Sequence, residues 1–192
     1  THETTRLVIE LLEKYVKNGD RMLDVGTGSG AIAVSTLHLR KDTTAVAFDI
    51  NENALSAAAN NAKINGVADR IEFEIADALS EDFLDGRKFD AVISNPPYIP
   101  ASVIPTLDPE VLLEPHRALD GGDDGLDFYR SIAKNFAPAL KPGGYLCFEF
   151  GMGQGDDICR ILEENGYTVL DRVRDFNQTE RALLARYDRK EE

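Results

Sequence analysis

The chain has 192 residues, 43% of them hydrophobic and 29% charged, and its 34 acidic and 21 basic residues give a formal charge of −13. This composition is ordinary for a globular protein, so we expect a single domain over residues 1–192. The acidic excess argues against a stable nucleic-acid partner, because binding phosphates needs a basic stripe and none is evident.

No apolar run approaches the roughly 20 residues that cross a bilayer, so we expect no membrane partner. The two cysteines, Cys147 and Cys159, form no CxxC pair and have no histidine nearby. This usage favours structural thiols in a reducing, cytoplasmic setting and gives no reason to expect a metal site. We expect the domain to be a monomer.

Apolar periodicity divides the chain into helices and strands. It predicts, in chain order, a helix over 4–16, a strand over 21–25, a helix over 31–39, a strand over 43–50, a helix over 52–66, strands over 71–78, 89–98 and 144–150, and an antiparallel pair over 167–173 and 180–187. Alternating strands and helices indicate an α/β fold with a doubly wound, mostly parallel, seven-stranded Rossmann-like sheet. The antiparallel hairpin completes that sheet at the C-terminus, and the strand over 71–78 is expected near an edge.

The segment 99–125 does not fit this alternation. It is rich in proline, glycine and aspartate and has no clear periodicity. Long irregular segments inside compact domains are often functional, so we interpret this one as a candidate lid.

The stretch DVGTGSGA (24–31) lies between a predicted buried strand and a helix. Its glycine loop, residues 26–30, lets the backbone approach a ligand, and the helix start offers free N–H groups. Asp49, at the end of the second strand, is suited to accept hydrogen bonds from the two hydroxyls of a ribose. These features fit NAD and S-adenosylmethionine equally well.

Three further features favour S-adenosylmethionine. Asp24 precedes the first glycine, where a carboxylate suits the cationic amino acid end of that cofactor. Asp77 ends the third strand and is suited to accept a hydrogen bond from an adenine amino group. The C-terminal antiparallel pair is typical of the class I methyltransferase fold.

The stretch SNPPYIP (94–100) follows an apolar strand. Two prolines end a strand, and they also stiffen the residues around them; we call residues 95–98 the proline corner. The side-chain carbonyl of Asn95 and the backbone carbonyl of Pro96 could accept hydrogen bonds from a planar NH₂ group and orient its nitrogen for methyl transfer. Tyr98 could pack against the same planar group, and the corner is therefore a predicted catalytic site.

Seven segments carry a resemblance to a known family. They are HETT (2–5), DVGTGSGAIAVS (24–35), AFDINENAL (47–55), SNPPYIP (94–100), EPHRALDGGDDGLDFYR (114–130), LKPGGYLCFEFGMGQ (140–154) and RDFNQTERALLAR (174–186). On these segments the chain resembles the class I S-adenosylmethionine-dependent methyltransferases that modify nitrogen. Within that class it is most similar to the catalytic domain of the release factor glutamine methyltransferases, the HemK/PrmC family.

The resemblance implies methyl transfer to the side-chain amide nitrogen of the glutamine in the Gly-Gly-Gln motif of peptide chain release factors. It implies that Asn95, Pro96, Pro97 and Tyr98 hold that amide, with Asn95 also beside the cofactor. The residues implied to bind S-adenosylmethionine are Gly26, Thr27, Gly28, Ser29, Gly30, Asp49, Asp77 and Ala78.

The chain departs from the family in two respects. The usual helical N-terminal domain, which helps to dock the release factor, is absent from the expected domain 1–192. In HETT, Thr5 stands where the family's R-P-E-T-E motif has its final Glu. These departures affect the identity of the substrate more than the chemistry.

Other functions stay open on the residues alone. An N-methyltransferase acting on an exocyclic amine of a DNA or RNA base could use the same corner, although the charge disfavours it. An NAD oxidoreductase and a cofactor-binding module without catalysis are further alternatives. Glu149, at the end of the fifth strand, could face the cleft or bond nearby backbone N–H groups.

Overall fold

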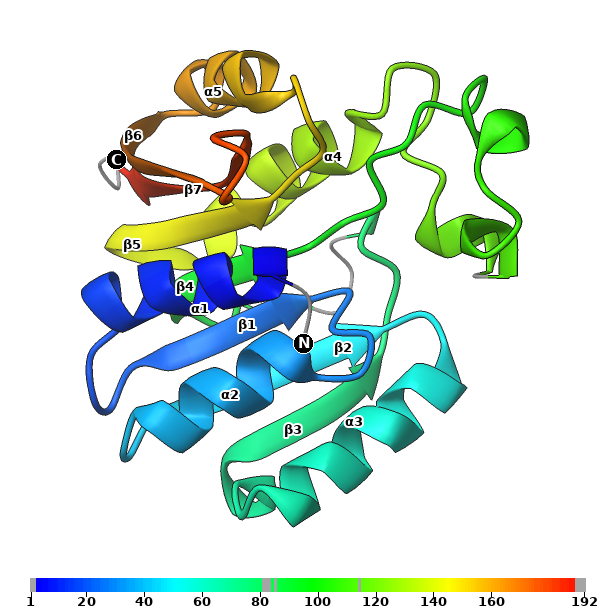
Figure 1. Ribbon diagram of the computed structural model, residues 1–192. Helices are drawn as coiled ribbons and strands as arrows, with labels where there is room; N and C mark the ends of the chain where they lie inside the picture. The colour runs from blue at the N-terminus through cyan, green and yellow to red at the C-terminus, as the bar shows by residue number, and fades with distance from the viewer. Residues whose placement is uncertain (1–2, 81–83, 85, 114, 189–192) are drawn as a thin grey trace.

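The computed structural model describes residues 3–80, 84, 86–113 and 115–188, so His2 and Glu114 of the family segments lie outside it. The seven predicted strands form one sheet in the order β3-β2-β1-β4-β5-β7-β6, which confirms the predicted fold class and places β3 at an edge (Figure 1). Strands β1 to β5 are parallel, and β7 is antiparallel to both β5 and β6. The strands are β1 (Arg21–Val25), β2 (Thr44–Asp49), β3 (Ile71–Ile75), β4 (Phe89–Ser94), β5 (Leu140–Glu149), β6 (Tyr167–Arg174) and β7 (Glu180–Tyr187).

Helices cover both faces of the sheet. They are α1 (Glu3–Tyr15), α2 (Ala31–Leu39), α3 (Glu52–Ile64), α4 (Asp127–Asn135) and α5 (Gly155–Glu164). Helices α1, α2 and α3 contribute to one buried apolar cluster, and α4 and α5 contribute to the other, on the opposite face (Figure 1). Because the central strands are covered on both sides, they read as nearly continuous apolar runs in the sequence.

Two predicted strands, over 71–78 and 89–98, end at least three residues early, whereas β5 begins at Leu140, ahead of the predicted residue 144. β3 ends at Ile75 because Asp77 forms a turn, with its Oδ1 accepting the backbone N–H of Leu79 at 2.9 Å. β4 ends at Ser94, since Pro96 and Pro97 have no N–H group with which to continue the ladder. The expectation that the two prolines end the strand is therefore confirmed, because the last residue of β4 is Ser94, directly before Asn95.

Two helices, α4 and α5, were not delimited from the sequence, and both pack on the same face of the sheet. The predicted irregular segment 99–125 is made of turns and three short 3₁₀ helices, Ile104–Thr106, Val111–Leu113 and His116–Ala118. It lies beyond the carboxyl ends of the parallel strands (Figure 1). Among the described residues, no helix combines the length and the apolar character that crossing a membrane requires.

Candidate active site

Strands β1 and β4 are neighbours, and their carboxyl ends bring the two predicted motifs together. β1 pairs with β2 on one side and β4 on the other. The connection after β1 leads to β2, and the connection after β4 leads to β5 on the opposite side, so the strand order reverses between β1 and β4. In open α/β sheets a crevice forms at such a switch point. Val25 and Ser94 are paired in register, and the Ser94 hydroxyl donates to the Val25 carbonyl at 2.8 Å. The glycine loop and the proline corner therefore start side by side.

The glycine loop is held by contacts with β2 and α3. The Thr27 N–H donates to the Phe48 carbonyl at 2.9 Å, which attaches the loop to the end of β2. Gly30, with φ +77°, packs on α3: a Cβ at this position would lie 3.0 Å from the Ala58 Cβ and 3.3 Å from a Val34 methyl carbon. Only glycine fits this conformation and this approach without strain. Ser29, in the same loop, accepts a hydrogen bond on its carbonyl from the Asn61 amide at 2.9 Å.

Asp49 joins the glycine loop to the end of β2. Its Oδ2 accepts the Gly28 N–H at 2.9 Å, and its Oδ1 accepts the Asn51 N–H at 2.9 Å. Each carboxylate oxygen still has a second lone pair after these bonds. Asp49 thus ends β2, as its sequence position predicted, and it has acceptor capacity left for a pair of hydroxyls.

Asp24 lies underneath the glycine loop and is only 2% exposed. Its Oδ2 accepts the Thr27 hydroxyl at 2.8 Å and the Ala33 N–H at 3.3 Å. Burial is the main cause that raises the pKa of Asp24 from 3.8 to about 6, and the hydrogen bonds from Thr27 and Ala33 partly oppose it. A positive charge brought close to such a buried carboxylate would favour its ionised form.

Asp77 and Ala78 follow β3 at the edge of the site. Asp77 is exposed, and its backbone carbonyl accepts the Ser80 N–H at 3.0 Å to close a turn. Ala78 is half-buried, and its carbonyl accepts the Ser131 hydroxyl of α4 at 3.4 Å. This turn lies beside the carboxyl end of β2, because β3 pairs with β2 in parallel and Ile75 lies opposite Asp49.

The residues of the proline corner differ in how deeply they are buried. Pro96 is buried and Pro97 is half-buried, while Tyr98 packs partly against the apolar cluster under α4. The Asn95 side chain is exposed, and its amide forms no hydrogen bond within the described part of the chain. The corner is therefore fixed by its prolines and tyrosine, with one amide presented outward.

Sequence reasoning missed two side chains that support the site. The buried Tyr129 of α4 donates its hydroxyl to the Glu149 carbonyl at 3.0 Å, and burial raises the pKa of this tyrosine. Gln154, just before α5, contacts the proline corner directly. Both fall in segments quoted for the family, but neither has a local signal for its role, because Tyr129 bonds Glu149 20 residues away and Gln154 reaches Tyr98 across 56. Glu149, whose role was open, is buried at 3% exposure.

The chemistry of the site follows from this set of groups. Three carboxylates gather at the carboxyl ends of three neighbouring strands: Asp24 near the end of β1, Asp49 at the end of β2 and Asp77 just after β3. This edge suits a cationic ligand that carries hydroxyls. Among the residues that the structure describes, no group of three or more His, Cys, Asp or Glu side chains could hold a metal ion.

The chain is similar in sequence to known methyltransferases. A family model described as ribosomal protein L11 methyltransferase (PrmA) matches residues 1–116. A release factor glutamine methyltransferase of Clostridium acetobutylicum is 38% identical over 184 residues, which are 94% of this chain and 65% of that protein. One from Rhodospirillum rubrum is 41% identical, over 88% of this chain and 51% of that protein.

Solved structures share the fold. An RNA methyltransferase from Salinibacter ruber in complex with S-adenosyl-L-homocysteine superposes with a TM-score of 0.61 at 18% identity, over 97% of this chain and 94% of that one. The chain spans between about half and two thirds of the length of the two curated relatives. The chain belongs to the methyltransferase family that the PrmA model describes, and over most of its length it is similar in sequence to proteins named release factor glutamine methyltransferases.

Proposed function

We propose that this chain transfers a methyl group from S-adenosylmethionine to the side-chain amide nitrogen of the glutamine in the Gly-Gly-Gln motif of peptide chain release factors. The observation that carries the proposal is the placement of the proline corner directly beside the glycine loop, through the paired residues Val25 and Ser94. A methyl donor on the loop and a planar amide on the corner would lie next to each other.

The residues at the carboxyl edge fit S-adenosylmethionine. This cofactor supplies an electrophilic methyl group on a positively charged sulfur. Asp49 has free acceptor capacity for the ribose hydroxyls. The Asp77 turn follows β3, the strand next to β2, where Asp77 would accept a hydrogen bond from the adenine amino group. A Cβ added at Gly26 or Gly28 would have no neighbouring atom within 4 Å, so open space lies against the loop backbone. The ionised Asp24 below the loop would be favoured by the positive charge of the ligand.

The proline corner fits the glutamine amide. The nitrogen of an amide is a poor nucleophile because its lone pair is delocalised into the carbonyl group. Asn95 can accept one amide hydrogen on its side-chain oxygen, and the Pro96 carbonyl can accept the other, which directs the nitrogen toward the methyl group. Tyr98 can cover the planar face of the amide and exclude water. No strong general base is required, because the methylated cation loses its proton readily.

Curated relatives support the release factor as the substrate. Both match nearly the whole chain, and both are named release factor glutamine methyltransferases. The PrmA model names a different protein, ribosomal protein L11, and it matches only residues 1–116. An acidic enzyme that acts on a protein loop is also consistent with the charge of −13.

A labelling experiment tests the proposal. The protein is incubated with S-adenosylmethionine labelled in the methyl group and with a release factor, either intact or with the glutamine of its Gly-Gly-Gln motif changed to alanine. We expect label only in the intact factor, at the glutamine, as located by peptide mass spectrometry. Ribosomal protein L11 and total RNA are offered as parallel substrates. Equal labelling of both release factors, or preferential labelling of L11 or RNA, would refute the proposed substrate.

A further inference from the structure

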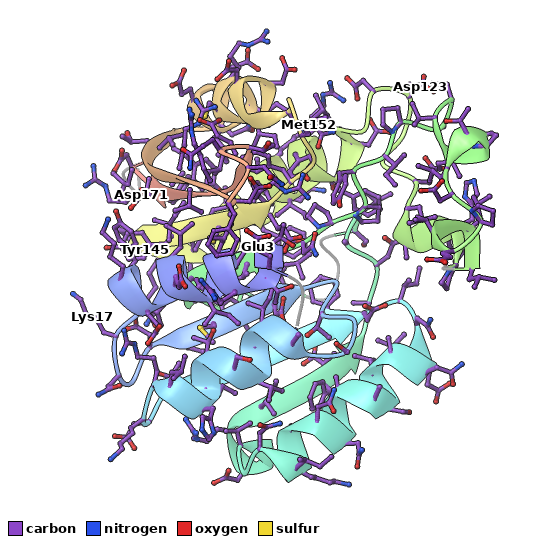
Figure 2. All side chains as sticks on the ribbon, viewed as in Figure 1. Glu3, Lys17, Asp123, Tyr145, Met152 and Asp171 are labelled. Carbon is purple, nitrogen blue, oxygen red and sulfur yellow. The ribbon has the colours of Figure 1, made fainter. Side chains whose placement is uncertain are left out.

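Gln154 forms hydrogen bonds to three separate segments. Its Nε2 donates to the Tyr98 carbonyl at 3.0 Å and to the Gly125 carbonyl at 3.2 Å. Its Oε1 accepts the Gly151 N–H at 2.9 Å. These partners lie 56, 29 and 3 residues away in the sequence. Figure 2 labels Met152, in the turn that leads to Gln154, and Asp123, in the loop that contains Gly125.

The proline corner depends on such contacts with its neighbours. Pro96 and Pro97 have no N–H groups, so hydrogen bonds donated by their backbone cannot hold them. The chain is fixed just beyond them, where the Ile99 N–H donates to the Leu119 carbonyl at 3.0 Å and the Gly121 N–H donates to the Ile99 carbonyl at 2.9 Å. Gln154 adds a side-chain donor to the carbonyl of Tyr98 itself, within the corner.

Backbone packs closely against Gln154 and Tyr98 at two glycines. A Cβ on Gly125, whose φ is +77°, would lie 2.4 Å from the Tyr98 carbonyl oxygen and 2.8 Å from Gln154 Nε2. A Cβ on Gly151 would lie 2.8 Å from the Tyr98 ring and 2.9 Å from Gln154 Oε1. Two backbone segments therefore approach the tyrosine and the glutamine from different sides.

The chemistry of these contacts selects an amide. Two carbonyl oxygens require two donor hydrogens, and one N–H requires an acceptor, which a glutamine side chain supplies and no ionised side chain does. A carboxylate in the same place would face two carbonyl oxygens and repel both. The arrangement of two acceptors and one donor therefore matches an amide side chain.

We infer that Gln154 is a positioning residue, which fixes the proline corner in the geometry needed to orient the amide nitrogen of the substrate. The inference rests on the proposed function for its catalytic consequence. Gln154 acts through Tyr98, so its loss affects the turnover number more than the affinity for S-adenosylmethionine.

The test compares Gln154→Glu with Gln178→Glu. The first change keeps the size of the side chain and the acceptor for Gly151, but it removes both donor hydrogens. The second adds the same charge at an exposed position in the hairpin between β6 and β7. Hydrogen exchange of the Ile99 and Gly121 amides, followed by mass spectrometry or NMR, reads the order of the corner without any methyl transfer.

We expect the Ile99 and Gly121 amides of Gln154→Glu to exchange about tenfold faster, because a hydrogen bond of ordinary strength is lost from the same unit. We expect kcat to fall about 10- to 100-fold, since small misplacement of a reacting group has effects of this size. The Kd for S-adenosylmethionine should change less than about twofold. Lowering the pH should restore part of kcat, because the protonated carboxyl group regains one donor hydrogen.

Gln178→Glu should leave every one of these quantities unchanged. Exchange rates and kcat of Gln154→Glu equal to those of the control would overturn the inference. If Gln154→Glu does not fold, Gln154→Met replaces it, with similar volume and no charge, and the same exchange rates decide. If the wild-type protein labels no release factor, the proposed function fails, whereas the exchange measurement still decides whether Gln154 orders the corner.

Discussion

The Gly28 N–H donates to the Asp49 carboxylate at 2.9 Å, and this bond connects the glycine loop after β1 to the end of β2. The same carboxylate accepts the Asn51 N–H at 2.9 Å, which lies just before α3. One side chain therefore orders the loop and presents oxygen atoms at the edge of the site. Its position explains why loss of its charge should affect ligand binding more than folding.

Asp49→Asn should raise the Kd for S-adenosylmethionine about 10- to 100-fold, because hydrogen bonds to a charged group contribute about 1.5–3 kcal/mol. The amide oxygen can still accept one of the two backbone N–H bonds, but the NH₂ group that replaces the other oxygen cannot accept the second. Titration calorimetry measures the affinity. Asp69→Asn removes the same charge from an exposed position before β3 and should leave the Kd unchanged. Equal weakening by both changes would indicate a general charge effect instead.

Asp24→Asn should stabilise the protein above pH 6. Burial raises the pKa of Asp24 from 3.8 to about 6, so the folded protein binds one more proton than the unfolded chain between these values. The stability of the wild-type protein therefore falls as the pH rises through this window and then levels off. A shift of this size corresponds to about 3 kcal/mol, and the amide oxygen can still accept the bonds from Thr27 and Ala33.

Urea unfolding at several pH values checks the effect of Asp24→Asn. The free energy of unfolding of the variant should exceed that of the wild type by about 3 kcal/mol above pH 6, and the difference should disappear toward pH 4. Asp69→Asn, again the matched control, should show no such pH dependence. A constant difference at all pH values would mean that the ionisation of Asp24 is not the cause.

Asn95→Ala should lower kcat about 100- to 1,000-fold, the loss typical of removing one hydrogen-bonding group that acts on the transition state. The Asn95 side chain is exposed and contributes no hydrogen bond to the described fold, so the melting temperature should stay the same. Methyl transfer to the release factor measures the effect. Asn60→Ala, on the exposed side of α3, is the matched control. A drop in melting temperature that parallels the loss of kcat would assign Asn95 a structural role.

Gly30→Ala separates the cost of a left-handed backbone from the cost of crowding. Gly19 has φ +87°, and a Cβ added there would have no atom within 4 Å. Gly30 has φ +77°, and a Cβ added there would lie 3.0 Å from the Ala58 Cβ. Gly19→Ala should destabilise the protein by about 1 kcal/mol through its φ angle alone. Gly30→Ala should cost about 1–3 kcal/mol more, because the inserted methyl group overpacks the contact between the loop and α3. Equal losses in urea unfolding would show that the contact with Ala58 adjusts freely.

Local patterns were sufficient to predict the strands of the parallel sheet, because the central strands are buried on both faces and read as apolar runs. Their ends were less well predicted. The pattern IEFEIADA continued to residue 78, but β3 ends at Ile75, where the sheet edge gives way to the Asp77 turn. Helices α4 and α5 were not delimited, although the spacing of their buried residues, such as Tyr129, Ile132 and Ala133 in α4, is a helical pattern that the sequence already contains.

The sequence by itself determined the order of the strands' motifs: a glycine loop after one apolar run, Asp49 after the next and the proline corner after a third. It also placed Asp24 and Asp77 at strand ends, since residues at the carboxyl ends of parallel strands share one edge. Only the tertiary structure decided that Asp24 is buried beneath the loop and that Gln154 reaches Tyr98 across 56 residues. The physical reason is that burial and side-chain hydrogen bonds depend on which distant segments meet, and no local pattern encodes that meeting.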